Sequence, residues 1–141
     1  MSKPPLNVTL TWDHALEFTG QSGNHEVGLD GSSYTAPSPM AMLALSLAGC
    51  MAIDLVHILT RGRHPVTALT TTFTGERATE EPHRFVKIDL AFTIATSASV
   101  EQVDRALALS RNKYCSVWNS LRQDIEFNVT YELKDEAAQT Q

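Results

Sequence analysis

Cysteine is scarce in this chain: Cys50 and Cys115 are the only two among 141 residues. They form no CxxC pair, so the sequence gives no zinc signature. In a reducing compartment, two cysteines are more often redox-active or simply buried than joined as a structural staple. The cysteines are therefore the first candidates for chemistry, with plain burial as the alternative.

Positive charge is also limited. Arginine is missing from the first 60 residues, and no basic cluster with interleaved aromatic residues occurs. The net charge of −5 argues against non-specific binding to nucleic acid or to an anionic membrane. The histidines have no common spacing, so we interpret His57 as structural rather than as a metal ligand. Nothing in the sequence indicates an organic cofactor.

A secretory signal peptide, internal repeats and low-complexity stretches are not found either. The first six residues contain one Lys and are followed by no apolar core, so we expect a cytoplasmic protein. The length fits a single domain with a substantial core, which we place at residues 1–133. The polar tail, residues 134–141, is expected to be disordered.

The longest apolar run, residues 38–63, is predicted to form one helix from about Pro39 to Arg61. Ser38 can cap this helix, and Pro39 is tolerated in a first helical turn, where its missing N–H would have no partner. Alanine, methionine and leucine then follow, all of which favour a helix. Gly62 follows the last periodic residues, as expected at a helix C-terminus.

This helix is apolar on nearly every face from Met40 to Ile53, a pattern typical of a helix that is buried or spans a membrane. The uninterrupted apolar part is short for a span, so we predict a central core helix. Cys50, Asp54 and His57 are spaced i, i+4 and i+7 and share one face. Two interpretations stay open. The three side chains act together in a reaction, or Cys50 is simply buried and Asp54 and His57 are polar residues where the helix leaves the core.

The remaining segments carry strand and helix signals in the order βββ-α-ββ-αα-β. Strands are predicted over Val8–Trp12, Ala15–Thr19, His25–Leu29, Val66–Arg77, Phe85–Thr96 and Ile125–Leu133, and helices over Val100–Ser110 and about Tyr114–Leu121. Ser99 and Gln102 form a capping-box pattern. The segregation of strands from helices predicts an α+β fold. Because the central helix is too apolar for one side to face water, we also predict an obligate homodimer with this helix at or near the interface.

Two motifs carry a family resemblance. SPMAMLALSLAGCMAIDLV includes Cys50, and RALALSRNKYCSV includes Cys115. In these motifs the chain resembles the OsmC/Ohr family of thiol-dependent peroxidases, and it is most similar to the OsmC-like, or YhfA-like, branch. The resemblance implies an intertwined α+β homodimer, with two antiparallel sheets around long central helices.

The resemblance also implies a reaction and its residues. Cys50 matches the peroxidatic thiol, which attacks an organic hydroperoxide and becomes a sulfenic acid, and Cys115 matches the resolving thiol. The implied partners are a second copy of the chain, a hydrophobic hydroperoxide or other apolar small molecule, and a dithiol reductant. Neither a nucleic acid nor a membrane is implied.

The chain departs from the family pattern in its charged groups. Peroxidases of this family pair the thiolate with an Arg from the N-terminal strands, which a Glu near the helix start orients, and both are missing here. Arg77, Arg84 or Lys113 could supply the cation, with Asp54 as a further supporting residue. The alternative function is a catalytically degenerate relative that binds a hydrophobic small molecule or senses redox state through its thiols.

Overall fold

The computed structural model describes residues 3–134, which divide into two compact units on either side of residue 43. The first unit is a three-stranded antiparallel meander in the order β1-β2-β3. Its strands are β1 (Thr9–His14), β2 (Glu17–Ser22) and β3 (His25–Asp30). All three were predicted from the sequence, with bounds that differ by up to three residues.

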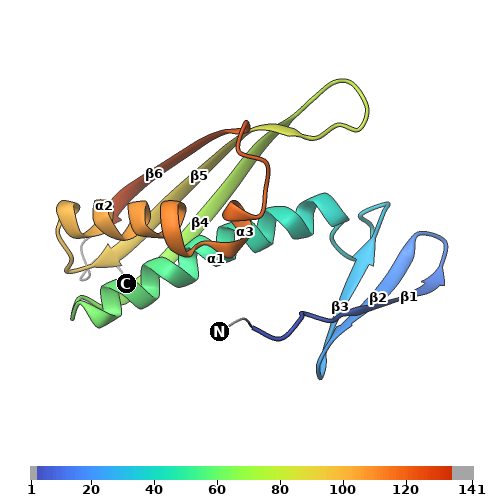
Figure 1. The fold of residues 1–141 in the computed structure, drawn as a ribbon, viewed down its shortest axis with the longest axis horizontal. Helices are drawn as coiled ribbons and strands as arrows, with labels where there is room; N and C mark the ends of the chain where they lie inside the picture. Colours follow the sequence, from blue (N-terminus) through green and yellow to red (C-terminus); the bar gives the residue numbers. More distant parts are fainter. Residues whose placement is uncertain (1–2, 135–141) are drawn as a thin grey trace. The chain divides into compact units, whose positions relative to one another are not determined.

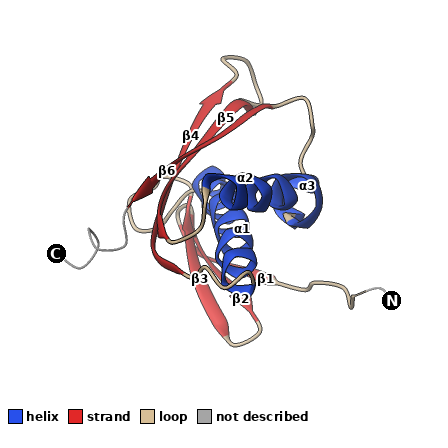
Figure 2. Ribbon diagram, turned by 90° about the vertical axis from the view of Figure 1, so that its left-hand side faces the viewer, coloured by secondary structure: helices blue, strands red, loops and turns tan. Residues whose placement is uncertain are grey.

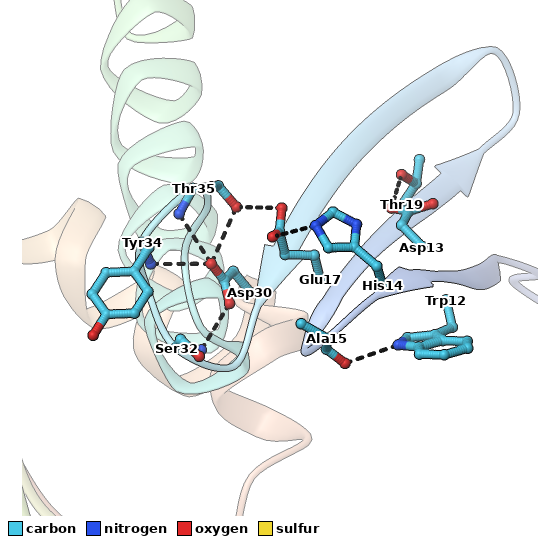
Figure 3. Close-up of polar contacts among 10 residues, drawn as sticks. All are labelled: Trp12, Asp13, His14, Ala15, Glu17, Thr19, Asp30, Ser32, Tyr34 and Thr35. Atoms are coloured by element: carbon cyan, nitrogen blue, oxygen red, sulfur yellow. Dashed lines mark hydrogen bonds and ion pairs between the residues drawn. The ribbon is translucent and has the colours of Figure 1, made fainter.

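A buried carboxylate organises the loop that follows β3 (Figure 3). Asp30 accepts backbone hydrogen bonds from Ser32 at 2.8 Å, from Tyr34 at 3.1 Å and from Thr35 at 3.0 Å. The Thr35 and Ser32 amides are the main reasons that the pKa of Asp30 lies below its ordinary value. The Thr35 hydroxyl also donates to Glu17 at 2.9 Å, which ties the loop to β2.

The second unit contains a sheet in the order β4-β5-β6, and helices lie along one face of that sheet (Figures 1 and 2). Its elements are most of α1 (Pro39–Arg61), β4 (Val66–Arg77), β5 (Phe85–Thr96), α2 (Val100–Leu109), a five-residue π turn (Ser110–Tyr114), α3 (Ser116–Asn119) and β6 (Glu126–Lys134). The predicted capping box of α2 is present: the Ser99 side chain accepts from the Gln102 amide, and the Gln102 side chain accepts from the Ser99 amide.

The core of this unit follows the two periodicities of its sequence. On α1, buried residues recur every four positions at Leu47, Met51, Leu55 and Leu59, so they line one side of the helix. On β5, every second residue from Ile88 to Ile94 is buried, as the alternation predicts. Val103, Ala106 and Leu107 complete the core from α2.

The α+β fold class and the element order are confirmed, with two corrections. The second sheet is not wholly antiparallel, because β5 pairs with β6 in parallel. The reason is that α2 and α3 form a crossover that returns the chain in the same direction. The predicted helix over Tyr114–Leu121 is reduced to the four residues of α3, and Tyr114 lies before this helix and is 49% exposed.

Two further predictions concern the number of domains and the C-terminal tail. A single domain over residues 1–133 stays a prediction. Lys134, which we placed in the disordered tail, is instead the last residue of β6 and pairs with Ala95, and residues 135–141 of the predicted tail lie outside the described residues. By length and composition α1 could span a membrane, a test that the core helices of soluble proteins also pass. Leu45, Ile53 and Val56 lie exposed on α1, so the single chain covers only part of this apolar helix.

Candidate functional site

The first thiol of the candidate site lies in the middle of α1. Cys50 is partly buried and directly precedes Met51, which belongs to the buried side of the helix. The predicted stripe divides in the structure: Asp54, one turn on, is half-buried, whereas His57 is exposed. Cys50 and Asp54 are therefore partly shielded from solvent in the single chain, and His57 is not.

The second thiol is fully buried at the end of the π turn. The Cys115 amide donates to the Ser110 carbonyl at 2.7 Å, an i to i+5 bond that closes the turn. Its sulfur accepts a hydrogen bond from the Trp118 amide at 3.3 Å and so caps α3. The main chain on both sides of Cys115 is therefore held by hydrogen bonds that involve this residue.

The fold brings Cys50 and Cys115 together, and both are free thiols. The pKa of Cys115 is raised to about 11, chiefly because burial disfavours the thiolate. The Trp118 amide acts in the opposite direction, while hydrogen bonding and charge from Cys50, and the charge of Asp54, add to the rise. Cys115 is consequently protonated near neutral pH.

Asp54 has a partner that sequence reasoning missed. Its Oδ2 accepts a hydrogen bond of 2.7 Å from the Ser110 hydroxyl, and Ser110 is fully buried. Ser110 lies in the second cysteine motif, five residues before Cys115. The available signal was this serine on an otherwise apolar helix face, at the end of the helix predicted over Val100–Ser110.

The proposed supporting cations have contacts elsewhere. Arg77 donates to the His83 carbonyl at 2.7 Å, and Arg84 donates to the Phe85 carbonyl at 3.1 Å; both lie around the β4–β5 connection. Lys113 is exposed and lies over the Tyr114 ring, with 5.4 Å between the ammonium nitrogen and the ring centre.

A fourth cation, Arg111, was not singled out from the sequence and lies four residues before Cys115. The Arg111 guanidinium lies 4.8 Å from the centre of the Phe127 ring and 5.9 Å from that of Trp118. The groups that shift the pKa of Cys115 include none of the four cations. The single chain therefore supplies burial and a carboxylate to this thiol, rather than positive charge.

Two of the hollows beside α1 include residues of the exposed side of this helix. One, of about 490 Å³, is lined by Ala52, Ile53, Val56, His57, Thr60 and Leu69. The other, of about 470 Å³, is lined by Asp54, His57, Ile58, Arg61, Leu109 and Tyr114. The first is almost wholly apolar, and the second adds a carboxylate and a guanidinium. Within residues 3–134, no three His, Cys, Asp or Glu side chains gather closely enough to hold a metal ion.

Comparison with known proteins agrees with the cysteine motifs. The family model described as "OsmC-like protein" matches residues 30–130. Protein YhfA of Escherichia coli is 38% identical over 132 residues, which cover 91% of this chain and 98% of YhfA.

Solved structures share the fold. An OsmC-like protein from Mycoplasma pneumoniae has a TM-score of 0.82 at 18% identity, covering 94% of this chain and 99% of that one. An organic hydroperoxide resistance protein from Elizabethkingia anophelis has a TM-score of 0.69 at 16% identity, with coverages of 94% and 99%. The two motifs, the matched family model and the YhfA alignment lead to one conclusion: this chain belongs to the OsmC-like protein family.

Proposed function

We propose that this protein is a thiol-dependent peroxidase that reduces organic hydroperoxides and serves in oxidative-stress defence. The observation that carries the proposal is that two free thiols lie close enough to interact: Cys50 on α1 and Cys115 at the end of the π turn. Membership of the OsmC-like family supports it. So does the shared fold with proteins titled organic hydroperoxide resistance proteins.

The proposed reaction has two steps on the protein. The Cys50 thiolate attacks one oxygen of the hydroperoxide, the O–O bond breaks, and the alkoxide leaves as an alcohol after taking a proton. The Cys115 sulfur then attacks the Cys50 sulfenic acid; an S–S bond forms, the S–O bond breaks, and the hydroxyl leaves as water with the Cys115 proton. Two electrons pass from the thiols to the peroxide, and an external dithiol restores both thiols by exchange.

The exposed apolar surface supports two further parts of the proposal. Ile53 is 69% exposed and Val56 is 38% exposed on α1, beside the apolar hollow. A homodimer that packs these faces together would remove this surface from water and leave apolar walls suited to an alkyl substrate. We place this dimer in the cytoplasm, where a dithiol reductant is available to reopen the disulfide.

The test is mass spectrometry of the protein after one equivalent of cumene hydroperoxide, with peroxide loss followed in parallel. We expect a rapid Cys50–Cys115 disulfide and matching peroxide loss. Cys50→Ser should lose the reaction, whereas Cys115→Ser should stop at a Cys50 sulfenic acid, which dimedone would trap. Thiols that oxidise no faster than free cysteine would contradict the proposal.

A second candidate function is a thiol redox sensor or a binder of hydrophobic small molecules. The observation in its favour is that the contacts of Arg77, Arg84 and Lys113 are with groups other than the two thiols. Without a nearby cation, a smaller fraction of a thiol is present at neutral pH as the thiolate, which is the nucleophilic form. Cysteine oxidation without catalytic turnover, in the presence of excess dithiol, would favour this candidate over the peroxidase.

A further inference from the structure

Asp54 and Ser110 form a bridge between the two cysteine-bearing segments. Asp54 lies four residues after Cys50 on α1, about 6 Å along the helix at 1.5 Å per residue. Its carboxylate accepts the Ser110 hydroxyl at 2.7 Å. Ser110 in turn accepts the Cys115 amide at 2.7 Å through its main-chain carbonyl. One helix thus carries the first thiol and, through Ser110, holds the main chain of the second.

The hydrogen bond between Asp54 and Ser110 is made at the first residue of the π turn. A π turn is rare, and it is found mostly as a single turn within or next to an α-helix, frequently at a functional site. Ser110 begins this turn, and its own amide is shared between the carbonyls of Ala106 and Leu107. Its hydroxyl is wholly buried, so loss of the Asp54 partner would leave a buried polar group unsatisfied. The hydrogen bond therefore fixes the point from which the turn to Cys115 starts.

The same carboxylate also acts on the second thiol by charge. Burial, Cys50 and Asp54 all raise the pKa of Cys115, and the Trp118 amide lowers it. The neighbouring cations, Arg111 and Lys113, lie over aromatic rings and are not among the groups that shift this pKa. Asp54 thus contributes both to the place and to the protonation of Cys115.

We propose that Asp54 is a positioning residue, which acts through Ser110 to hold Cys115 against Cys50 and which places a negative charge beside Cys115. This inference rests on the proposed thiol-pair function and deepens it. A protonated Cys115 is not the first thiol to attack a peroxide, and its proton is the one with which the sulfenic hydroxyl leaves as water.

Two variants separate the charge from the hydrogen bond. Asp54→Asn keeps an oxygen that accepts the Ser110 hydroxyl but removes the charge. Ser110→Ala keeps the charge but removes the hydrogen bond. Asp89→Asn is the matched control, because Asp89 is also a partly buried carboxylate that accepts a side-chain hydrogen bond. Its donor is the side-chain amide of Asn128, at 2.9 Å on the neighbouring strand.

The charge is tested in the Cys50→Ser background by the pH dependence of Cys115 alkylation with iodoacetamide. Asp54→Asn should move the midpoint to lower pH by about half a unit or more, since a nearby negative charge is removed. Asp89→Asn should leave it unchanged. An unmoved midpoint in Asp54→Asn would overturn the role of the charge.

The hydrogen bond is tested in the two-cysteine chain by the rate at which diamide closes the Cys50–Cys115 disulfide at pH 7. Ser110→Ala should slow closure about tenfold or more, because misplaced reacting atoms lose proximity. Asp54→Asn should close at least as fast as the unchanged chain. Closure of Ser110→Ala at the unchanged rate would overturn the inference.

A merely structural role would lower the melting temperature without these selective changes at Cys115. If Ser110→Ala fails to fold, Asp54→Ala, which removes the same hydrogen bond, takes its place in the diamide assay, with Asp54→Asn as the control for loss of charge alone. Neither readout requires peroxide turnover, so a chain that behaves as expected here but consumes no hydroperoxide would refute the proposed function alone.

Discussion

Burial of Cys115 couples its proton to folding. The thiol ionises near pH 9 in the unfolded chain, whereas its raised pKa of about 11 keeps it protonated in the fold. Between these values only the unfolded chain loses the proton, so the free energy of unfolding should fall as pH rises from 9 to 11, by on the order of 1–2 kcal/mol. Urea unfolding at stepped pH measures this. Cys115→Ser should show a smaller fall, to which Tyr131, whose pKa is raised to about 12, still contributes. An equal fall in both chains would contradict the prediction.

Asp30 should make the loop before α1 sensitive to acid. Its lowered pKa means that the ionised carboxylate is favoured in the fold, so its contribution is present above about pH 4 and is lost as pH falls through the lowered value. NMR of the Tyr34 and Thr35 amides between pH 6 and 2 would follow this loss. Asp30→Asn should show weakened amide protection already at pH 6. Asp13→Asn, which affects a carboxylate bound to the Thr19 hydroxyl in the same unit, should not.

At the scale of the elements, the pairing of β4 with β5 requires a glycine at position 75. A Cβ on Gly75 would lie 2.5 Å from a ring carbon of Phe85 and 2.7 Å from one of Phe73. These two rings form an edge-on pair, with 5.3 Å between their centres. Gly75→Ala should therefore destabilise the fold by about 1–3 kcal/mol through overpacking, seen as a lower melting temperature. Thr74→Ala, at the exposed neighbouring position, is the control, and equal melting temperatures would count against this packing argument.

Local patterns were sufficient where local chemistry decides the structure. The bounds of α1 follow from Pro39 at its start and Gly62 after its end, and the buried face of β5 follows from strict alternation. The α2 capping box was likewise readable from Ser99 and Gln102. In each case the determining residues lie within a few positions of the feature.

Only part of the candidate site could be predicted, because its other features depend on residues that are distant in the sequence. Tyr114, Val117, Trp118 and Leu121 fit a helical period, yet the main chain from Ser110 onward forms a π turn. The hydrogen bond between Ser110 and Asp54 joins positions 56 residues apart, which no local pattern reports. The cysteines themselves were found because they are rare and lie in two motifs, whereas their close approach is a property of the fold.

At the scale of the whole molecule, the exposed apolar surface predicts the state of assembly. Trp12 in the first unit and Ile53 in the second are each more than 60% exposed in the single chain. Light scattering should therefore give about twice the 15.5 kDa mass of one chain. Val56→Glu, on the exposed face of α1, should yield monomer or unfolded chain, whereas Thr72→Glu on β4 should stay dimeric. A folded monomer of the unchanged protein at micromolar concentration would refute the prediction.

The π turn also determines where the chain can change in length. A turn closed from i to i+5 contains one residue more than an α-helical turn, and each helical residue rotates the chain by about 100°. Deletion of one residue between Ser110 and Cys115 would restore α-helical phase and swing the second thiol around the helix axis, away from Cys50. The β4–β5 connection, a surface loop at residues 78–84, carries no such angular constraint. Among relatives that keep both thiols, insertions and deletions should therefore accumulate in that loop and spare the segment from Ser110 to Cys115.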